Sequence, residues 1–285
     1  MRRDTDQIQA TPRDFRVMGY MAHMEAVRRD HLRMVFSAFP GGKFKDGKFI
    51  ADSTLKDQIE RYRKAGWIMY QRFLNEPGWA IPTRRGLRLV GLDGFYPAHI
   101  PAESRYHHLW AVNEIRMFWY SSDDEEQLAG TWISERQLKA EVADAAKKKK
   151  RLVEEDGGYS PAPIQILRGA IPDGVVVGEG CAWVDAVEVE LTNKGPEETK
   201  DKLARLCLAV FRERLTGNES IYSQIHFYVP SEEAKQLVEK ERAKLGEDLR
   251  PDRIDIVVDE ALKRLRSDFE PKGQKEQWSS ETVAQ

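Results

Sequence analysis

Three carboxylates in the second half of the chain have the spacing of a metal-binding site. Asp173 stands in the Pro-Asp-Gly of an expected strand, and Glu188 and Glu190 follow 15 and 17 residues later in the run AVEVEL. Because side chains alternate along a strand, Glu188 and Glu190 share one face, where two negative charges repel each other. A divalent cation such as Mg²⁺ or Mn²⁺ would offset that repulsion and could activate water for attack on a phosphate. Asp173 and Glu188 are therefore the predicted metal ligands.

This order of residues resembles the PD-(D/E)xK motif of restriction-endonuclease-like folds. In that motif an Asp and a Glu hold a divalent ion, and a lysine follows two residues after the Glu. Here Glu190 occupies the lysine position, and Lys194 could supply the amine or be an ordinary surface lysine; Glu135 is a candidate upstream carboxylate. The resemblance implies a catalytic set of Asp173, Glu188, Glu190 and Lys194 in a Mg²⁺-dependent nickase or endonuclease. The alternative is a docking surface on a nuclease fold without activity.

Histidines and cysteines offer weaker signals for chemistry. His107 and His108 open an aromatic-rich helical segment, so they fit either a metal or catalytic role or simple packing and capping at the start of that helix. Cys181 and Cys207 lie in apolar surroundings without further His or Cys at metal-ligand spacing, which predicts thiols in the core of a protein from a reducing compartment.

The charges divide the chain into a basic and an acidic part. Residues 1–100 contain 18 Lys and Arg against 11 Asp and Glu, a balance of +7, whereas the rest contains 27 against 36, a balance of −9. A basic segment joined to an acidic one indicates that the first part meets a polyanion such as nucleic acid. The alternative is an uneven distribution of ordinary surface charge.

The elements expected in the basic part follow the order of a winged helix-turn-helix. Thr11 and Pro12 begin a first helix, a second ends before Pro40, and a third runs from a Ser53 cap to Gly66; two short strands within 67–83 then form a hairpin. In such a domain the third helix reads bases and the hairpin contacts phosphates, although these domains also dock proteins. The predicted DNA-binding residues are Lys56, Arg61, Arg63, Lys64, Arg72, Arg84, Arg85 and Arg88.

The remaining chain alternates strands and helices. Strands are expected in 169–177 and 181–194, a helix after residue 196, then a strand, a serine-capped helix and a last strand, which is an α/β arrangement. The lysine-rich stretch 140–163 is expected to be a surface loop. The fold class is therefore α+β, with a winged-helix domain in 1–100, an α/β nuclease-like domain in 101–265 and a disordered tail in 266–285.

Five motifs in order resemble one family of mobile-element proteins. The expected winged helix is followed by HHLWAVNEIR, WISERQL, IPDGVV and AVEVELTNK, and this series is similar to the replication-relaxation family of plasmids and integrative elements over about residues 14–230. The resemblance implies a role in plasmid replication or DNA relaxation, with duplex DNA and other replication or transfer proteins as partners. It supplies no catalytic residues, and no tyrosine or histidine cluster typical of a relaxase nucleophile site occurs in the chain.

Composition fits a cytoplasmic protein. The chain of 285 residues has 32% charged residues, no apolar run long enough for a bilayer and no apolar segment of a secretory signal at its beginning. We therefore expect a DNA-binding factor of plasmid or mobile-element replication, which needs no membrane and no cofactor beyond a Mg²⁺ or Mn²⁺ ion. The alternatives are the Mg²⁺-dependent nuclease and a transcriptional regulator whose second domain senses a partner. The oligomeric state stays open.

Overall fold

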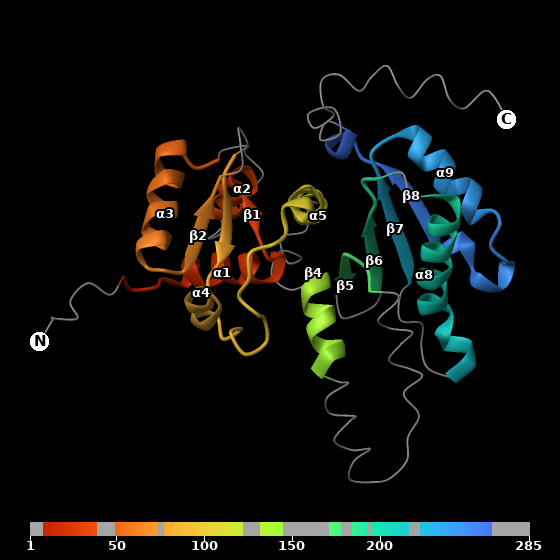
Figure 1. Cartoon of the computed structure of the whole chain (residues 1–285), viewed down its shortest axis with the longest axis horizontal. Helices are drawn as coiled ribbons and strands as arrows, with labels where there is room; N and C mark the ends of the chain where they lie inside the picture. Colours follow the sequence, from red (N-terminus) through yellow and green to blue (C-terminus); the bar gives the residue numbers. More distant parts are fainter. Residues whose placement is uncertain are drawn as a thin grey trace, which may run out of the picture. The chain divides into compact units, whose positions relative to one another are not determined.

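A computed structural model describes eight stretches of the chain (Figure 1), which are residues 8–38, 49–72, 77–121, 132–144, 171–177, 184–192, 195–216 and 223–263. The chain divides into two compact units, Met1–Ala186 and Val187–Gln285, and the division falls within strand β6 (Val184–Val189).

The first unit begins with three helices and a small antiparallel sheet. The helices are α1 (Pro12–Met24), α2 (Arg29–Ala38) and α3 (Asp52–Lys64), and the strands are β1 (Val27–Arg28), β2 (Ile68–Gln71) and β3 (Trp79–Pro82). Strand β3 lies in the middle, so the order is β1-β3-β2. The predicted helices and hairpin are confirmed here, whereas the two-residue β1 was too short to be predicted.

Helix boundaries follow local sequence, with one exception. The Thr11 side chain accepts a hydrogen bond from the Asp14 amide, and the Asp14 side chain accepts one from the Thr11 amide, so Pro12 begins α1 as expected. Helix α3 begins earlier than predicted: its N-cap is Ala51, without a side-chain hydrogen bond, so the expected cap at Ser53 is wrong. Gly66 ends the helix at a φ of +68°, a conformation that glycine adopts at little cost.

The β2–β3 hairpin defines two ends of this sheet. Its register pairs Ile68 with Pro82 and Gln71 with Trp79, so residues after Gln71 lead into the hairpin connection and residues after Pro82 leave at the opposite end. Trp79, which is 1% exposed, packs into the core of the unit. The side chain of Tyr70 lies so close to Gly78 that a Cβ there would meet its ring at 2.4 Å, so a larger residue at this position would displace the end of the Tyr70 side chain.

A second group of elements completes the first unit. These are α4 (Arg84–Leu89), the 3-10 turn η2 (Glu103–Arg105), α5 (Tyr106–Ser121), β4 (Trp132–Ser134), a helical stretch over 135–144 and β5 (Gly174–Val177). Helix α5 is bound to the N-terminal helices: Tyr20 donates a hydrogen bond to the Asn113 side chain at 3.1 Å, and His31 Nε2 lies 2.5 Å from Glu114. The compact unit that holds α1 to α3 therefore extends past residue 100.

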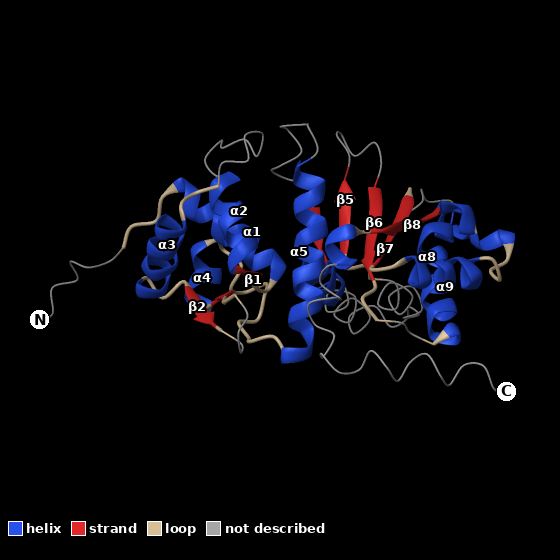
Figure 2. Cartoon of the chain, turned by 90° about the horizontal axis from the view of Figure 1, so that it is seen from above, coloured by secondary structure: helices blue, strands red, loops and turns tan. Residues whose placement is uncertain are grey.

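The second unit contains the end of β6, α8 (Pro196–Thr216), β7 (Gln224–Val229), α9 (Glu232–Arg242), η5 (Glu247–Leu249), η6 (Pro251–Arg253) and β8 (Ile254–Val258). Strands β7 and β8 are parallel, α9 packs against both, and α8 packs against α9 (Figure 2). The expected serine cap of α9 is confirmed, because Ser231 Oγ accepts a hydrogen bond from the Ala234 amide. A five-stranded sheet has the order β4-β5-β6-β7-β8.

With helices and two sheets in one chain, the fold is α+β, as expected. The helical stretch over 135–144 shows that the expected surface loop is wrong over 140–144, where the helix continues. Four predictions fall outside the described residues: the loop within 145–163, Cys181, Lys194 and the tail over 266–285. No helix within the described stretches is long and apolar enough to cross a membrane.

Candidate functional site

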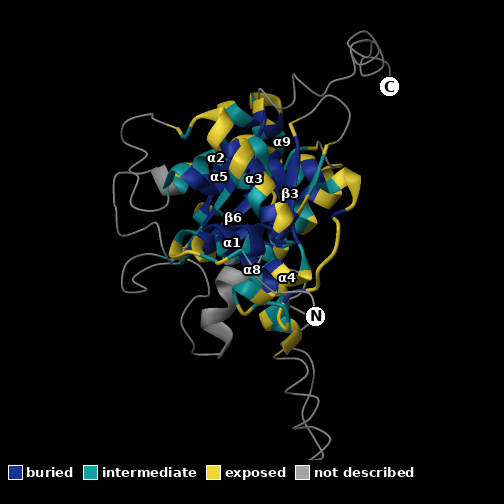
Figure 3. Cartoon of the chain, turned by 90° about the vertical axis from the view of Figure 1, so that its left-hand side faces the viewer, coloured by how far each residue is buried: buried dark blue, intermediate teal, exposed yellow. Residues whose placement is uncertain are grey.

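A basic groove runs between the outer face of α3 and strand β2. It has a volume of about 460 Å³, and four of the eight side chains that line it are cationic. Leu55, Ile59 and Tyr62 form the buried stripe of α3. The residues on the other side of the helix therefore face outward (Figure 3). The lining consists of Arg29, Lys56, Asp57, Ile59, Glu60, Arg63, Tyr70 and Arg72.

The cations of this groove differ in their partners. Arg29 Nη2 lies 2.7 Å from Asp52, and Arg63 Nη1 lies 3.0 Å from Glu60 on the preceding turn of the same helix. Lys56 and Arg72 are exposed and have no ion-pair partner among the described residues. An exposed pair such as Arg63 with Glu60 contributes little to stability, because water and salt screen it. The groove can therefore offer its cations to an anionic ligand.

Arg61, one of the predicted DNA-binding residues, is bound to a buried carboxylate. Its guanidinium donates hydrogen bonds of 2.8 and 2.7 Å to the two carboxylate oxygens of Asp14, which is 0% exposed, and a third to the Gln9 carbonyl. Tyr62 also donates to Asp14, at 2.8 Å. Burial raises the pKa of Asp14, but the hydrogen bonds from Arg61, Thr11 and Tyr62 outweigh it and hold that pKa below its usual range. Arg61 thus joins α3 to the start of α1.

The arginines of α4 lie at the other end of the hairpin from Arg72. Because Arg84 follows Pro82 and Arg72 follows Gln71, the strand register separates them by the length of β2. The side chain of Arg85 lies beside Gly66, just past the last turn of α3. Arg88 pairs with Asp93 at 3.1 Å. Lys64, which is 70% exposed, is in the last turn of α3 and lies 4.0 Å from Glu60. The eight predicted DNA-binding residues therefore do not form one surface.

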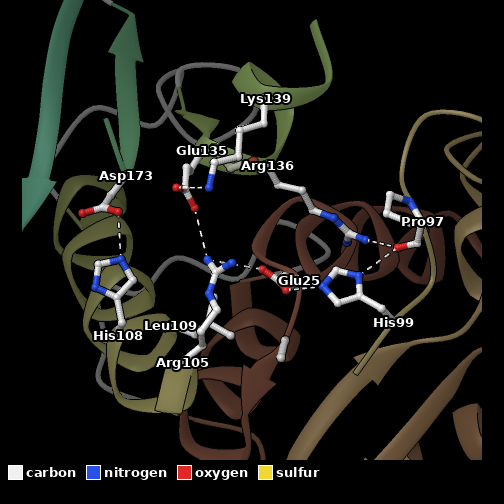
Figure 4. Close-up of polar contacts among 12 residues, drawn as sticks. Glu25, Pro97, His99, Arg105, His108, Leu109, Glu135, Arg136, Lys139 and Asp173 are labelled. Carbon is white, nitrogen blue, oxygen red and sulfur yellow. Dashed lines mark hydrogen bonds and ion pairs between the residues drawn. The ribbon is translucent and has the colours of Figure 1, made fainter. Parts of the chain in front are cut away.

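A second cluster of charged side chains is centred on Glu25 (Figure 4). Glu25 is 6% exposed, and its carboxylate contacts His99 at 2.6 Å and Arg105 at 3.6 Å. Its backbone has φ +68° and ψ −50°, and the Ala26 amide donates a 2.7 Å hydrogen bond to the Met24 carbonyl across it. This is a γ-turn with positive φ, a strained conformation for a residue with a side chain.

The cluster continues toward β4 and β5. Arg105 also lies 3.1 Å from Glu135, which pairs with Lys139 as well, and His108 Nε2 lies 2.8 Å from Asp173 (Figure 4). Burial lowers the pKa of His108, but the charge and hydrogen bond of Asp173 outweigh it, so that pKa is raised. His108 therefore favours its protonated form when Asp173 is ionised.

A histidine paired with a carboxylate can serve acid–base catalysis, but the surroundings here favour a structural role. Glu25, Glu135 and Asp173 each have a cationic partner, and the space among these side chains is about 20 Å³. That volume is close to the space one water needs and far below that of a small-molecule pocket. The cluster joins the end of α1, the segment 99–105, α5 and β5 within the first unit.

Glu188 and Glu190 share one face of β6, as predicted, and Lys202 of α8 contacts both. Lys202 Nζ forms an ion pair with Glu188 and lies 3.2 Å from Glu190, which also accepts a 3.0 Å hydrogen bond from Thr192 Oγ1. Glu188 is 4% exposed, so its charge needs this compensation. A lysine therefore occupies the position expected for a cation.

The metal and catalytic predictions are not decided by these contacts. Asp173 contacts His108, whereas Glu188 and Glu190 contact Lys202. Within the described stretches, no group of three or more His, Cys, Asp or Glu side chains is arranged to hold a metal ion. A Mg²⁺ or Mn²⁺ ion on Asp173 and Glu188, and the nuclease activity that it would support, stay predictions.

Sequence reasoning missed several residues that matter in these sites. Lys202 falls in the buried stripe of α8 beside Thr199, Leu203 and Leu206, and a lysine within such a stripe is a signal of a buried partner. Arg29 and Tyr70 enter the groove through tertiary packing, and no local pattern marks them. Cys207 is buried, and burial raises the pKa of its thiol to about 11, as expected for a core thiol.

No family model, curated protein or solved structure matches the chain.

Proposed function

We propose that this protein binds duplex DNA, with α1 to β3 as a winged helix. The order α1-β1-α2-α3-β2-β3 and the sheet order β1-β3-β2 support this proposal. In a helix-turn-helix domain the recognition helix enters the major groove, which is wide enough to admit it. Here α3 would be that helix, and the β2–β3 hairpin would contact the backbone.

The basic groove is the observation that carries the proposal. It combines the outward face of α3 with Arg72 at the hairpin connection, which are the two parts that would meet DNA together. Lys56 and Arg72 are exposed and lack an ion-pair partner within the described stretches, so neither cation must leave a carboxylate to bind a phosphate. Contacts of this kind supply salt-dependent affinity and position the protein, while base contacts from α3 supply specificity.

The proposed surface is smaller than the one predicted from sequence. It contains Lys56, Arg63 and Arg72, with Arg29 at its edge. Arg61 is excluded because it holds the buried Asp14, and the α4 arginines are excluded because they lie at the far end of the hairpin. The motifs of this chain resemble those of the replication-relaxation family. If that resemblance reflects function, the DNA would belong to a plasmid or mobile element, and replication or transfer proteins would be further partners in the cytoplasm.

The test measures affinity of the full chain for a mixed-sequence duplex at several salt concentrations. The triple variant Lys56→Ala/Arg63→Ala/Arg72→Ala should bind more weakly, and its salt slope should fall by about 0.9 for each phosphate that the variant no longer neutralises. The matched control is Arg84→Ala/Arg85→Ala/Arg88→Ala, which removes the same charge from α4 and should leave the slope unchanged. The reverse pattern would assign DNA binding to α4. If the wild-type chain does not bind at low salt, the proposal is wrong.

A further inference from the structure

Asp57 is a residue of the groove that DNA binding alone does not explain. It follows Lys56 on α3, is exposed, and lines the groove together with four cations. A carboxylate that faces phosphates lowers affinity for DNA because like charges repel. Its presence is explained by a ligand group that donates a hydrogen bond to a carboxylate.

The two carboxylates of the groove differ in how they are occupied. Glu60 Oε2 accepts a 3.0 Å hydrogen bond from Arg63, and Lys64 Nζ lies 4.0 Å from Glu60 Oε1. Asp57 has no ion pair of this kind with any described residue, and none of its neighbours on α3 bonds to it. Its two oxygens therefore keep their capacity to accept hydrogen bonds from a ligand.

The buried stripe of α3 fixes the direction of Asp57. Leu55, Ile59 and Tyr62 face the core, and Lys56, Asp57 and Glu60 are exposed between them. With α3 in the major groove, the outward positions face base edges and the phosphates that border them. Cytosine presents its N4 amino group there, which donates to Asp and Glu, whereas thymine and guanine present carbonyl oxygens that a carboxylate repels. Adenine also presents an amino group, but its N7 acceptor lies beside that group and repels a carboxylate, so cytosine is the base that fits Asp57 best.

We propose that Asp57 is a specificity-determining residue that accepts a hydrogen bond from the N4 amino group of a cytosine in the major groove. The inference rests on the proposed DNA-binding function and deepens it, because it names the base edge that the groove reads. Asp57 lowers the affinity for DNA of any sequence, but it discriminates against bases that present a hydrogen-bond acceptor to its carboxylate. Lys56 and Arg72 would provide the phosphate contacts that offset this reduction in affinity.

The experiment uses the full chain and a duplex selected by it from a randomised library. Each cytosine of that duplex is replaced in turn by pyrimidin-2-one, which lacks only the N4 amino group. At one position the replacement should lower wild-type affinity by roughly tenfold, within the range for removal of one specific base contact. The variant Asp57→Ala should bind the selected and the replaced duplex alike, because it has no carboxylate to accept the N4 hydrogen bond. The replacement also weakens the base pair, but it does so equally for the wild type and the variant, so a loss seen only in the wild type reports the contact with Asp57.

Glu60→Ala is the matched control, since it removes the same charge one turn further along α3. It should keep the tenfold discrimination at that cytosine, because Lys64 remains beside the Glu60 carboxylate when Arg63 turns to a phosphate. If Asp57→Ala and Glu60→Ala both raise affinity for every duplex and neither changes discrimination, Asp57 contributes charge only and the inference is wrong, while DNA binding stands. If the wild-type chain binds duplex DNA at low salt but enriches no sequence, the inference is wrong and DNA binding stands; if it binds no duplex at low salt, the proposed function fails as well.

Discussion

Arg61 and Arg63 stand two residues apart on α3, but they belong to different regions of the molecule. Arg61 turns inward to Asp14, a carboxylate with no exposed surface, and gives two hydrogen bonds to it. Arg63 turns into the open groove, where its side chain is 53% exposed and its partner Glu60 is 47% exposed. The same residue type thus stabilises the fold in one region and is available to a ligand in the other.

The difference shows that burial of the partner decides the role of a charged side chain. A buried carboxylate without a cation would be costly, so Arg61 cannot leave Asp14 without weakening the fold. An exposed pair contributes little, so Arg63 can exchange Glu60 for a phosphate at small cost. The same criterion assigns the Glu25 cluster to structure and the α3 groove to binding.

The largest expected effect separates these two arginines directly. Arg61→Ala should lower the free energy of unfolding by about 3 to 5 kcal/mol, because it leaves the Asp14 charge buried without its cation. Arg63→Ala should stay within about 0.5 kcal/mol of wild type, as expected for an exposed substitution. Urea unfolding followed by tryptophan fluorescence measures both. Equal destabilisation of the two variants would remove the distinction between the two regions.

Acidification should weaken the Asp14 region selectively. Because the pKa of Asp14 is lowered in the folded protein, its contribution is complete above the ordinary carboxyl pKa of about 4 and is lost as pH falls through the folded value. The stability difference between wild type and Asp14→Asn should therefore shrink as pH falls below about 4. Unfolding curves at matched pH values test this, and a difference that stays constant down to the lowest folded pH would contradict it.

The groove should respond in affinity rather than in stability. Arg72→Ala should weaken binding to a mixed-sequence duplex by up to about tenfold near 0.1 M salt, the size expected when one phosphate is no longer neutralised. Arg84→Ala, at the other end of the hairpin, is its control and should bind like wild type. Fluorescence anisotropy at 25 °C measures both. A lower melting temperature of Arg72→Ala would show that the Arg72 side chain stabilises the fold.

The smallest effect concerns His108 in the Glu25 cluster. Its pKa is raised in the folded protein, so its stabilisation is complete below the ordinary histidine pKa of about 6.5 and is lost as pH rises through the folded value. We expect a change below about 1 kcal/mol, because the pair is partly exposed. His108→Gln should flatten this pH dependence, and imidazole NMR should follow the titration. A folded pKa below 6.5 would contradict the assignment.

Local sequence was sufficient to predict most of the described elements. Thr11 and Pro12 mark the start of α1, Gly66 the end of α3, and Ser231 the start of α9, because each forms its cap within a few residues of the chain. The cap of α3 was missed because Ala51 makes no side-chain hydrogen bond, so nothing in its residue type marks the position.

The candidate sites were predictable only in part. The alternation along β6 correctly grouped Glu188 with Glu190, but it could not name Lys202, which reaches them from another element. Equally, His108 and Asp173 are 65 residues apart, and their contact depends on how α5 and β5 are brought together. A lysine in an otherwise buried stripe signals that a partner exists, but packing between elements decides which residues that partner includes.

The sequence by itself determined the α+β class, the order of helices and hairpin in the first unit, and the excess of cations in residues 1–100. These properties depend on residue type and spacing along the chain. Only the tertiary structure decided which cations face a buried carboxylate and which line a groove, because two arginines on one helix differ only in what packs against them. A charged side chain is committed to the fold when its partner is shielded from water, and sequence does not reveal that shielding.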